Sequence, residues 1–215
     1  MQLNKIEVDQ RTPEWFKMRE GRFTASQISR LLGKETLKTT QKSIQTYAHD
    51  AAVETVFGRE PELEYLPKDM QRGIDLEPMA FKKFSELMEQ DFVEVKECGF
   101  YPFGEHSGAS PDGLVGDTSI IEIKCPQRAK FFKYVINGAD EIALNYMAQM
   151  QWQMFCTDTN LCYFMNYIID AGREMWHIIE VERDEDMINV IRERIDIAIG
   201  YKNDFIIKIK DNKQF

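Results

Sequence analysis

Apolar residues recur with helical spacing through the front part of the chain. Residues 40–57 and 68–90 each carry an apolar stripe of this period, so a helix is predicted over each range, with a kink or a second start at Pro78. A shorter helix is predicted to begin at Pro13, because the Thr12 side chain can cap its N-terminus. Another is predicted to open at Thr24 and to end near Gly33.

Behind this helical part, several short stretches alternate between apolar and polar residues, which is the period of a strand. The predicted strands cover residues 92–97, 99–103, 107–110, 113–116, 119–125, 160–169 and 174–182. Helices are predicted over 128–137, 141–157 and 184–200, and residues 201–210 either continue the last helix or form a peripheral strand. This order predicts an α/β (α+β) fold with a central mixed β-sheet flanked by helices.

The length and the apolar content suit one hydrophobic core. We expect a single domain over residues 1–215, with a helix-rich N-terminal part (1–90), a core (about 91–182) and a C-terminal helix and tail (183–215). The start of the chain lacks a secretory pattern, and no apolar run reaches the roughly 18–20 residues that span a bilayer, so we expect a cytoplasmic protein without a membrane segment. The four cysteines form no C-x-x-C pair and are expected to be free, small apolar residues.

The strand predicted at 119–125 places charged residues among apolar ones. Glu122 and Lys124 alternate with Ile121 and Ile123, so the two charged side chains share one face while the isoleucines enter a core. Asp112 precedes this strand, and its Asp-Gly step predicts a turn that brings the carboxylate to the same point. Two carboxylates suit a hard divalent cation, and the lysine can position or deprotonate an attacking water. The alternative for Glu-x-Lys alone is an edge strand with a solvated ion pair.

Other candidate residues lie on the predicted helices. Glu77 is either a solvated helical glutamate or a further metal ligand. On the helix over 141–157, Gln149 and Gln153 share a stripe with Tyr146, and a glutamine there either faces water or orients a water or phosphate oxygen beside an acidic site. The three tryptophans are expected in the core rather than as platforms for stacked bases: Trp15, Trp152 and Trp176.

The net charge of −9 is unevenly distributed along the chain. Basic residues dominate residues 11–42 and acidic residues dominate 174–196, which fits either a surface that holds DNA in a defined place or uneven charge without a function. Arg19 and Ser26 bracket a glycine-containing turn in the basic part. One interpretation is that the two residues form a phosphate pocket near a helix N-terminus. The alternative is that Arg19 is an ordinary surface arginine.

Six short motifs between residues 15 and 153 occur in an order that resembles one nuclease family. They are Trp15-x-x-x-Arg19, Thr24-Ala25-Ser26, Arg72-Gly73 with Glu77, Gly108-x-Ser110-Pro111-Asp112-Gly113, Glu122-x-Lys124 and Tyr146-Met147-Ala148-Gln149-x-Gln151. The Pro-Asp…Glu-x-Lys pattern is typical of the PD-(D/E)xK nuclease superfamily, and the whole set resembles its YqaJ-type viral recombinase exonucleases. The region past about residue 170 carries no matching motif.

This resemblance implies a restriction-endonuclease-like core and a metal site. It implies that Asp112, Glu122 and the backbone carbonyl of Ile123 ligate Mg²⁺, with two ions per active site and Mn²⁺ as an alternative. By the same resemblance Lys124 holds or activates the water, and Glu77 and Gln149 complete the site.

The resemblance also implies a substrate and partners. Such an enzyme degrades the 5′-phosphorylated strand of linear double-stranded DNA processively in the 5′→3′ direction, and leaves 3′ single-stranded overhangs for phage recombination by strand annealing. Arg19, Ser26 and Ser110 would bind the 5′-phosphate. The implied partners are a single-strand annealing protein and two further copies of the chain in a toroidal trimer.

Two other functions remain as alternatives. An endonuclease of the same superfamily would usually carry an additional recognition domain, which 215 residues do not accommodate readily. A catalytically silent clamp on DNA ends would not need Asp112, Glu122 and Lys124 together.

Overall fold

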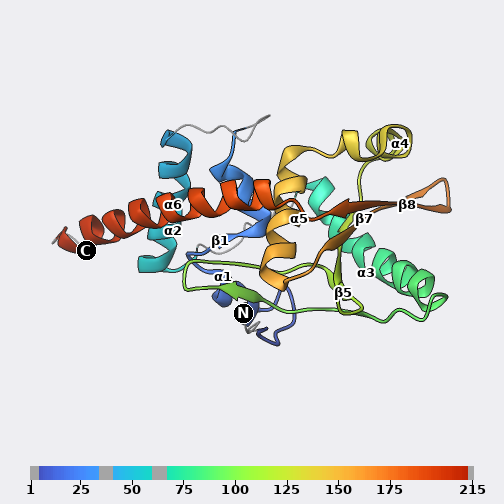
Figure 1. The fold of residues 1–215 in the computed structure, drawn as a ribbon, viewed down its shortest axis with the longest axis horizontal. Helices are drawn as coiled ribbons and strands as arrows, with labels where there is room; N and C mark the ends of the chain where they lie inside the picture. Colours follow the sequence, from blue (N-terminus) through green and yellow to red (C-terminus); the bar gives the residue numbers. More distant parts are fainter. Residues whose placement is uncertain (1–4, 34–40, 60–66, 213–215) are drawn as a thin grey trace.

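The computed structural model describes residues 5–33, 41–59 and 67–212, and a five-stranded sheet lies between residues 95 and 182 (Figure 1). Its strand order is β2-β5-β6-β7-β8. The strands are β2 (Val95–Lys96), β5 (Gly113–Val115), β6 (Ser119–Lys124), β7 (Leu161–Asp170) and β8 (Arg173–Glu182). The β6–β7 pair is parallel and the other pairs are antiparallel, which confirms the predicted mixed sheet.

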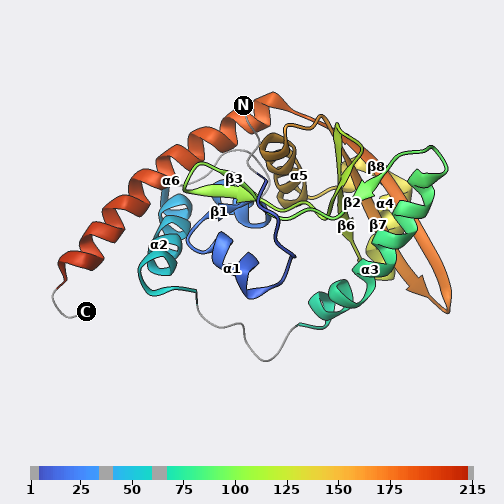
Figure 2. The same cartoon turned by 90° about the horizontal axis from the view of Figure 1, so that it is seen from below.

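Helices cover both faces of this sheet, and strand β6 is therefore buried (Figure 2). Helix α3 (Lys68–Glu89) continues through Pro78 and packs against Ile121 and Ile123 on one face. Helices α4 (Arg128–Asn137) and α5 (Leu144–Thr157) cover the other face, where Ile120 contacts Tyr134 and Met150. A short 3₁₀ helix, η2 (Gly138–Glu141), connects them.

A second, three-stranded sheet lies apart from the first, which the sequence did not predict. It contains β1 (Phe23–Thr24), β3 (Tyr101–Phe103) and β4 (Ser107–Ala109) in the order β1-β4-β3, with β1 parallel to β4. The strands predicted at 99–103 and 107–110 therefore form, but outside the central sheet. Thr24 of β1 was assigned to a helix start because a strand of two residues has no detectable period.

The helical front packs around this small sheet. Helix α1 (Pro13–Arg19) has the predicted Thr12 cap, and α2 (Gln41–Phe57) follows the predicted range. The segment after Thr24 is the 3₁₀ helix η1 (Ala25–Leu31) rather than an α-helix. Position 40, the first of the predicted range 40–57, lies outside the described residues.

The C-terminal helix α6 (Glu185–Asp211) includes the predicted tail, so residues 201–210 continue the helix. Its buried residues Ile191, Ile195 and Ala198 belong to the core around the small sheet. The four cysteines are free and buried, as predicted. None of the described helices is both long enough and apolar enough to cross a membrane.

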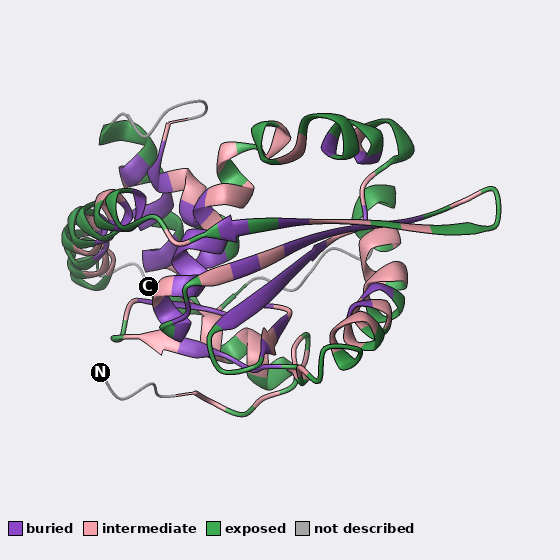
Figure 3. Cartoon of the chain, turned by 45° about the vertical axis from the view of Figure 1, so that its right-hand side comes forward, coloured by how far each residue is buried: buried purple, intermediate pink, exposed green. Residues whose placement is uncertain are grey.

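The hairpin of β7 and β8 extends past the helices at its far end (Figure 3). Trp176 on β8 is 40% exposed, so its predicted place in the core is wrong. Trp152 of α5 is fully buried, as predicted, and Trp15 of α1 is half-buried. Alternation along a strand predicts which face a residue occupies, but it does not predict where the covering helices end.

Candidate active site

Strand β6 brings Glu122 and Lys124 together on the face covered by α5. Glu122 is only 1% exposed, and its carboxylate accepts hydrogen bonds from Gln149 Nε2 and Gln153 Nε2, each at 2.7 Å. The Lys124 ammonium donates to the same carboxylate. A buried carboxylate needs such partners because an unpaired charge away from water is costly. The solvated edge strand is therefore excluded.

Asp112 is hydrogen-bonded to the same strand through both its backbone and its side chain. Its N–H donates to the Ile121 carbonyl at 3.1 Å, and its Oδ2 accepts from the Ile123 N–H at 2.6 Å. The predicted turn at the Asp-Gly step is wrong, because Gly113 already belongs to β5 and the positive φ of +56° falls on Gly116. Gly113 is needed for another reason: a Cβ there would lie 2.8 Å from the Phe81 ring and 2.9 Å from the Lys96 carbonyl oxygen.

Burial and neighbouring charges shift the pKa values of two groups at this centre, Asp112 and Lys124. Burial, then the charges of Glu122 and Glu77, raise the pKa of Asp112 well above its usual range. Burial alone would lower the pKa of Lys124, but the carboxylates of Glu122 and Asp112 outweigh it and raise that pKa, so Lys124 is an ammonium. Asp112 therefore lies near two other carboxylates, those of Glu122 and Glu77.

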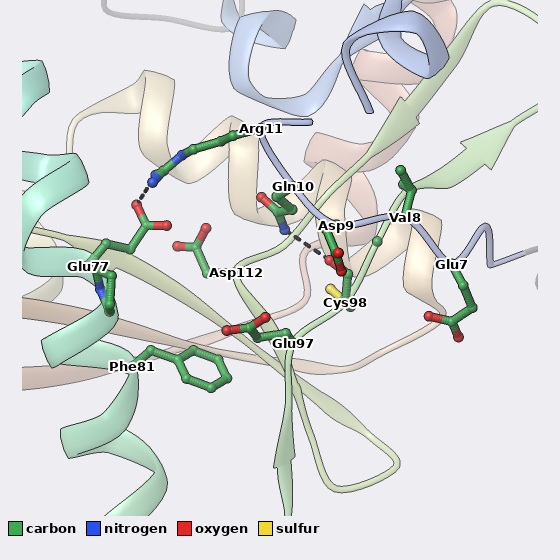
Figure 4. Close-up of a pocket in the computed structure, with 12 residues that line it drawn as sticks. Glu7, Val8, Asp9, Gln10, Arg11, Glu77, Phe81, Glu97, Cys98 and Asp112 are labelled. Carbon is green, nitrogen blue, oxygen red and sulfur yellow. Dashed lines mark hydrogen bonds and ion pairs between the residues drawn. The ribbon is translucent and has the colours of Figure 1, made fainter. Parts of the chain in front are cut away.

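Glu77 of α3 lies beside Asp112 and forms an ion pair with Arg11 (Figure 4). The distance between Arg11 Nη2 and Glu77 Oε2 is 2.5 Å. Glu77 and Asp112 line one cavity of about 470 Å³. Among the residues that the structure describes, no three His, Cys, Asp or Glu side chains converge closely enough to hold a metal by themselves.

A second, basic cavity is linked to this centre through Trp15. Arg19 stacks on the Trp15 ring, 4.0 Å from its centroid, and donates to Ser26 Oγ at 3.0 Å. Trp15 Nε1 donates to Ser110 Oγ at 2.9 Å, two residues before Asp112. The cavity measures about 260 Å³, and its lining residues include four arginines: Arg19, Arg22, Arg30 and Arg59.

Arg19 remains charged in this setting. Burial, followed by the positive charge of Arg59, lowers the pKa of Arg19 to about 10. The guanidinium is therefore protonated at neutral pH and can bind an anion. The contacts of Trp15 thus connect Arg19 and Ser26 to Ser110, which lies two residues before Asp112.

Residues 14–160 match the YqaJ-like viral recombinase domain, which is more than half of the chain. The chain belongs to the YqaJ-like viral recombinase family. The alkaline exonuclease LHK-Exo of Laribacter hongkongensis shares the fold with a TM-score of 0.77 and 30% identity, over 93% of this chain and 96% of that one. These similarities confirm the predicted family and fold class.

Two further proteins resemble this YqaJ-like chain. A phage-related exonuclease from Haemophilus somnus 129PT has a TM-score of 0.65 at 18% identity, over 90% of this chain and 99% of that one, which shows the fold alone. The uncharacterised protein ExoD of Escherichia coli strain K12 is 32% identical over 75 residues, which cover 32% of this chain and 86% of that protein. Family membership and the LHK-Exo fold support a phage-type exonuclease.

The side chains of the YqaJ-like centre fit the divalent cation that the family implies. Asp112 and Glu122 supply carboxylate oxygens, and the Ile123 carbonyl lies on the strand between Glu122 and Lys124. Burial raises the pKa of Asp112, and the neighbouring charges of Glu122 and Glu77 raise it further. A divalent cation would relieve the repulsion between these charges, so the donor set fits the metal.

Two residues with contacts at this centre, Trp15 and Arg11, were not assigned to it from the sequence, and Gln153 was left open between a solvated and a site residue. Gln153 follows Gln149 by one helical turn, so the pair could have been assigned together from the spacing. Trp15 belongs to the Trp15-x-x-x-Arg19 motif, but a tryptophan is more often a core residue. Nothing in the sequence pattern indicated that Arg11 reaches Glu77, 66 positions away.

Gln153→Leu is expected to reduce both stability and DNA digestion. The substitution removes the donor to Glu122 Oε2 and should lower the free energy of unfolding by about 1–3 kcal/mol. Gln151→Leu is the matched control, because Gln151 is equally buried in α5 but bonds to the Glu182 carbonyl and the Asp184 N–H. Urea unfolding should show both losses, whereas digestion at a temperature where both variants are folded should fall for Gln153→Leu alone. Equal digestion by the two variants would contradict a role for Gln153 at the centre.

Proposed function

We propose that this protein is a divalent-metal-dependent exonuclease that degrades the 5′ strand of linear double-stranded DNA. The observation that carries the proposal is the connection between two sites. Asp112, Glu122 and Lys124 gather at one end of β6, and the arginine-lined cavity joins them through Trp15 and Ser110. The related LHK-Exo is an alkaline exonuclease that has also been crystallised with dAMP, and a mononucleotide is what an exonuclease of this kind releases.

Asp112, Glu122 and the Ile123 carbonyl would hold the metal, with Glu77 and Gln149 completing the site. Two bound Mg²⁺ ions, or Mn²⁺ in their place, would activate the attacking water and stabilise the charge of an in-line displacement. The Lys124 ammonium would orient the water or a phosphate oxygen, since it lies at the open end of the strand with its side chain 25% exposed. Gln149 and Gln153 keep the Glu122 carboxylate in one orientation.

Magnesium dependence provides a direct test of the nuclease. Purified protein should release acid-soluble nucleotides from linear duplex DNA in Mg²⁺ and none in excess EDTA, and Mg²⁺ restored after EDTA should restore the release. Release that persists in EDTA would exclude the proposed metal site.

The arginine-lined cavity would determine the direction of digestion. A terminal 5′-phosphate is the one anion that marks a 5′ end, and Arg19 and Ser26 in this cavity would donate charge-assisted hydrogen bonds to it. Ser110, bonded to Trp15, would bind the phosphate from the side of Asp112. Holding that phosphate would place the first phosphodiester at Asp112 and Glu122. Each cut exposes a new 5′-phosphate, so the same cavity can guide successive steps.

Arg19→Ala is expected to remove the preference for phosphorylated ends. Loss of one charged hydrogen-bonding partner should raise KM for 5′-phosphorylated duplex about tenfold to a hundredfold, while digestion of 5′-hydroxyl duplex changes little. Lys17→Ala is a control on the same helix, since Lys17 is exposed and pairs with Glu20. A preference that survives Arg19→Ala would remove Arg19 from the phosphate site.

We further propose that three copies form a ring around the DNA and that a single-strand annealing protein receives the exposed 3′ strand. Enclosure would explain how a chain of net charge −9 remains on DNA, because a closed ring does not depend on strong electrostatic affinity. Light scattering should give three times the mass of the 25.2 kDa chain. A monomeric mass would remove this explanation of processivity.

A further inference from the structure

Residues 7–11 of the N-terminal segment line the cavity that also contains Asp112 and Glu77 (Figure 4). Ile6 pairs with Phe100 in an isolated β-bridge. Gln10 Nε2 donates to the Cys98 carbonyl at 3.0 Å and to the Pro111 carbonyl at 2.7 Å. Since Pro111 directly precedes Asp112, this segment is attached to the loop that carries the catalytic carboxylate.

Arg11 adopts a backbone conformation that arginine rarely takes. Its φ is +65°, in the left-handed region that strains a non-glycine residue. Bonds on either side hold the strained residue: Gln10 is tied to Pro111, and Thr12 Oγ1 donates to the Asp9 carbonyl at 2.7 Å. The strained backbone directs the Arg11 side chain toward Glu77.

Arg11 has an unusual place among the charges of this cavity. The described lining contains five carboxylates, and Arg11 is the one basic side chain among those lining residues. The acidic members are Glu7, Asp9, Glu77, Glu97 and Asp112. Arg11 forms its ion pair with Glu77, and among these carboxylates Glu77 is the one whose charge raises the pKa of Asp112.

We propose that Arg11 is the resident counter-ion of Glu77 and competes with the divalent cation for that carboxylate. The inference rests on the proposed function, because it requires a metal at Asp112. While Arg11 pairs with Glu77, the charge of this carboxylate is neutralised beside Asp112. Binding of the cation must release Glu77 from the guanidinium, so Arg11 weakens cation affinity. The metal site therefore fills completely only at higher cation concentrations.

Metal titration without DNA tests this competition. Isothermal titration calorimetry with Mn²⁺ alone would compare the parent chain with Arg11→Gly, whose glycine relaxes the left-handed backbone while removing the guanidinium. Arg11→Asn is a second variant that tolerates this backbone, and Arg11→Lys keeps the positive charge. Arg11→Gly and Arg11→Asn should tighten Mn²⁺ binding about twofold to fivefold, the factor expected for an exposed ion pair, and Arg11→Lys should remain near the parent.

Glu77→Gln shows whether the effect passes through the ion pair. Glu77→Gln should weaken Mn²⁺ binding. Adding Arg11→Gly to Glu77→Gln should then change the Mn²⁺ affinity less than Arg11→Gly changes it in the parent chain, because the carboxylate for which the guanidinium and the cation compete is gone. Unchanged affinity in both Arg11→Gly and Arg11→Asn, or an equal gain in the Glu77→Gln background, would overturn the proposal. A parent chain that binds no Mn²⁺ and digests no DNA would instead overturn the proposed function.

Discussion

Lys124→Met is expected to reduce digestion of linear duplex DNA by about a thousandfold or more while the chain stays folded. Lys124 donates to the Glu122 carboxylate, and its Nζ lies 5.1 Å from the centroid of the Tyr146 ring. Methionine keeps the apolar stem against that ring and removes the charge. A positioned proton donor or acceptor at a reacting centre contributes typically 10²–10⁴-fold, and the charge stabilisation that Lys124 supplies would be lost with it.

Lys130→Met is the matched control for this variant. Lys130 also pairs with a carboxylate, that of Glu141 at 2.7 Å, and also lies over a tyrosine ring, that of Tyr134 at 4.8 Å. It should keep the parental digestion rate, because this pair lies on α4 and η2 rather than on β6. Circular dichroism and thermal unfolding would verify that both variants are folded. A parental rate in folded Lys124→Met would contradict the assigned centre.

Asp112→Asn is expected to abolish digestion and, in EDTA, to make the protein more stable. Asparagine keeps an oxygen that can accept from the Ile123 N–H, so the loop can retain its attachment to β6. It removes one of the carboxylates that repel each other. Burial and the charges of Glu122 and Glu77 raise the pKa of Asp112 in the folded protein above its value in the unfolded chain. The contribution of Asp112 to the free energy of unfolding is therefore fully present below the unfolded pKa and is lost as the pH rises through the folded pKa. At neutral pH the parent therefore bears this cost and Asp112→Asn does not.

Thermal unfolding in EDTA and in Mg²⁺ compares the stability lost to carboxylate repulsion with the stability gained from metal binding. In EDTA the Asp112→Asn midpoint should exceed that of the parent by about 2–4 °C for each kcal/mol of repulsion relieved. In Mg²⁺ the parent should gain stability through binding while the variant gains little. A variant that is less stable than the parent in EDTA would show that the carboxylates do not repel each other as described.

The central strand of the site could be predicted because its pattern is local. Alternation of Ile121, Glu122, Ile123 and Lys124 assigns each side chain to a face from the strand period alone. The approach of Asp112 was predicted correctly, although the turn was placed wrongly: the Asp-Gly step indicated a turn, whereas Gly113 serves a close contact inside β5.

Contacts between distant segments could not be predicted in the same way. Arg11 reaches Glu77 from a backbone at a positive φ, next to Gln10, whose side chain is bonded to the Cys98 and Pro111 carbonyls. No sequence period encodes that conformation. Gln153 is ambiguous on a helix surface until α5 is placed over Glu122. The parallel pairing of β1 with β4 joins Phe23 to Ser107, two short segments without a pattern of their own.

Digestion of linear duplex DNA with three kinds of end tests the central claim most directly. Strands labelled at either terminus would be followed in Mg²⁺ on duplexes with 5′-phosphate ends, duplexes with 5′-hydroxyl ends and covalently closed circles, with Asp112→Asn as the inactive control. We predict loss of the 5′-terminated strand only, fastest with a 5′-phosphate, with 3′ overhangs left behind and circles intact. Cleavage of circles would contradict the account in favour of an endonuclease, and ends that are bound but never cut would leave a clamp.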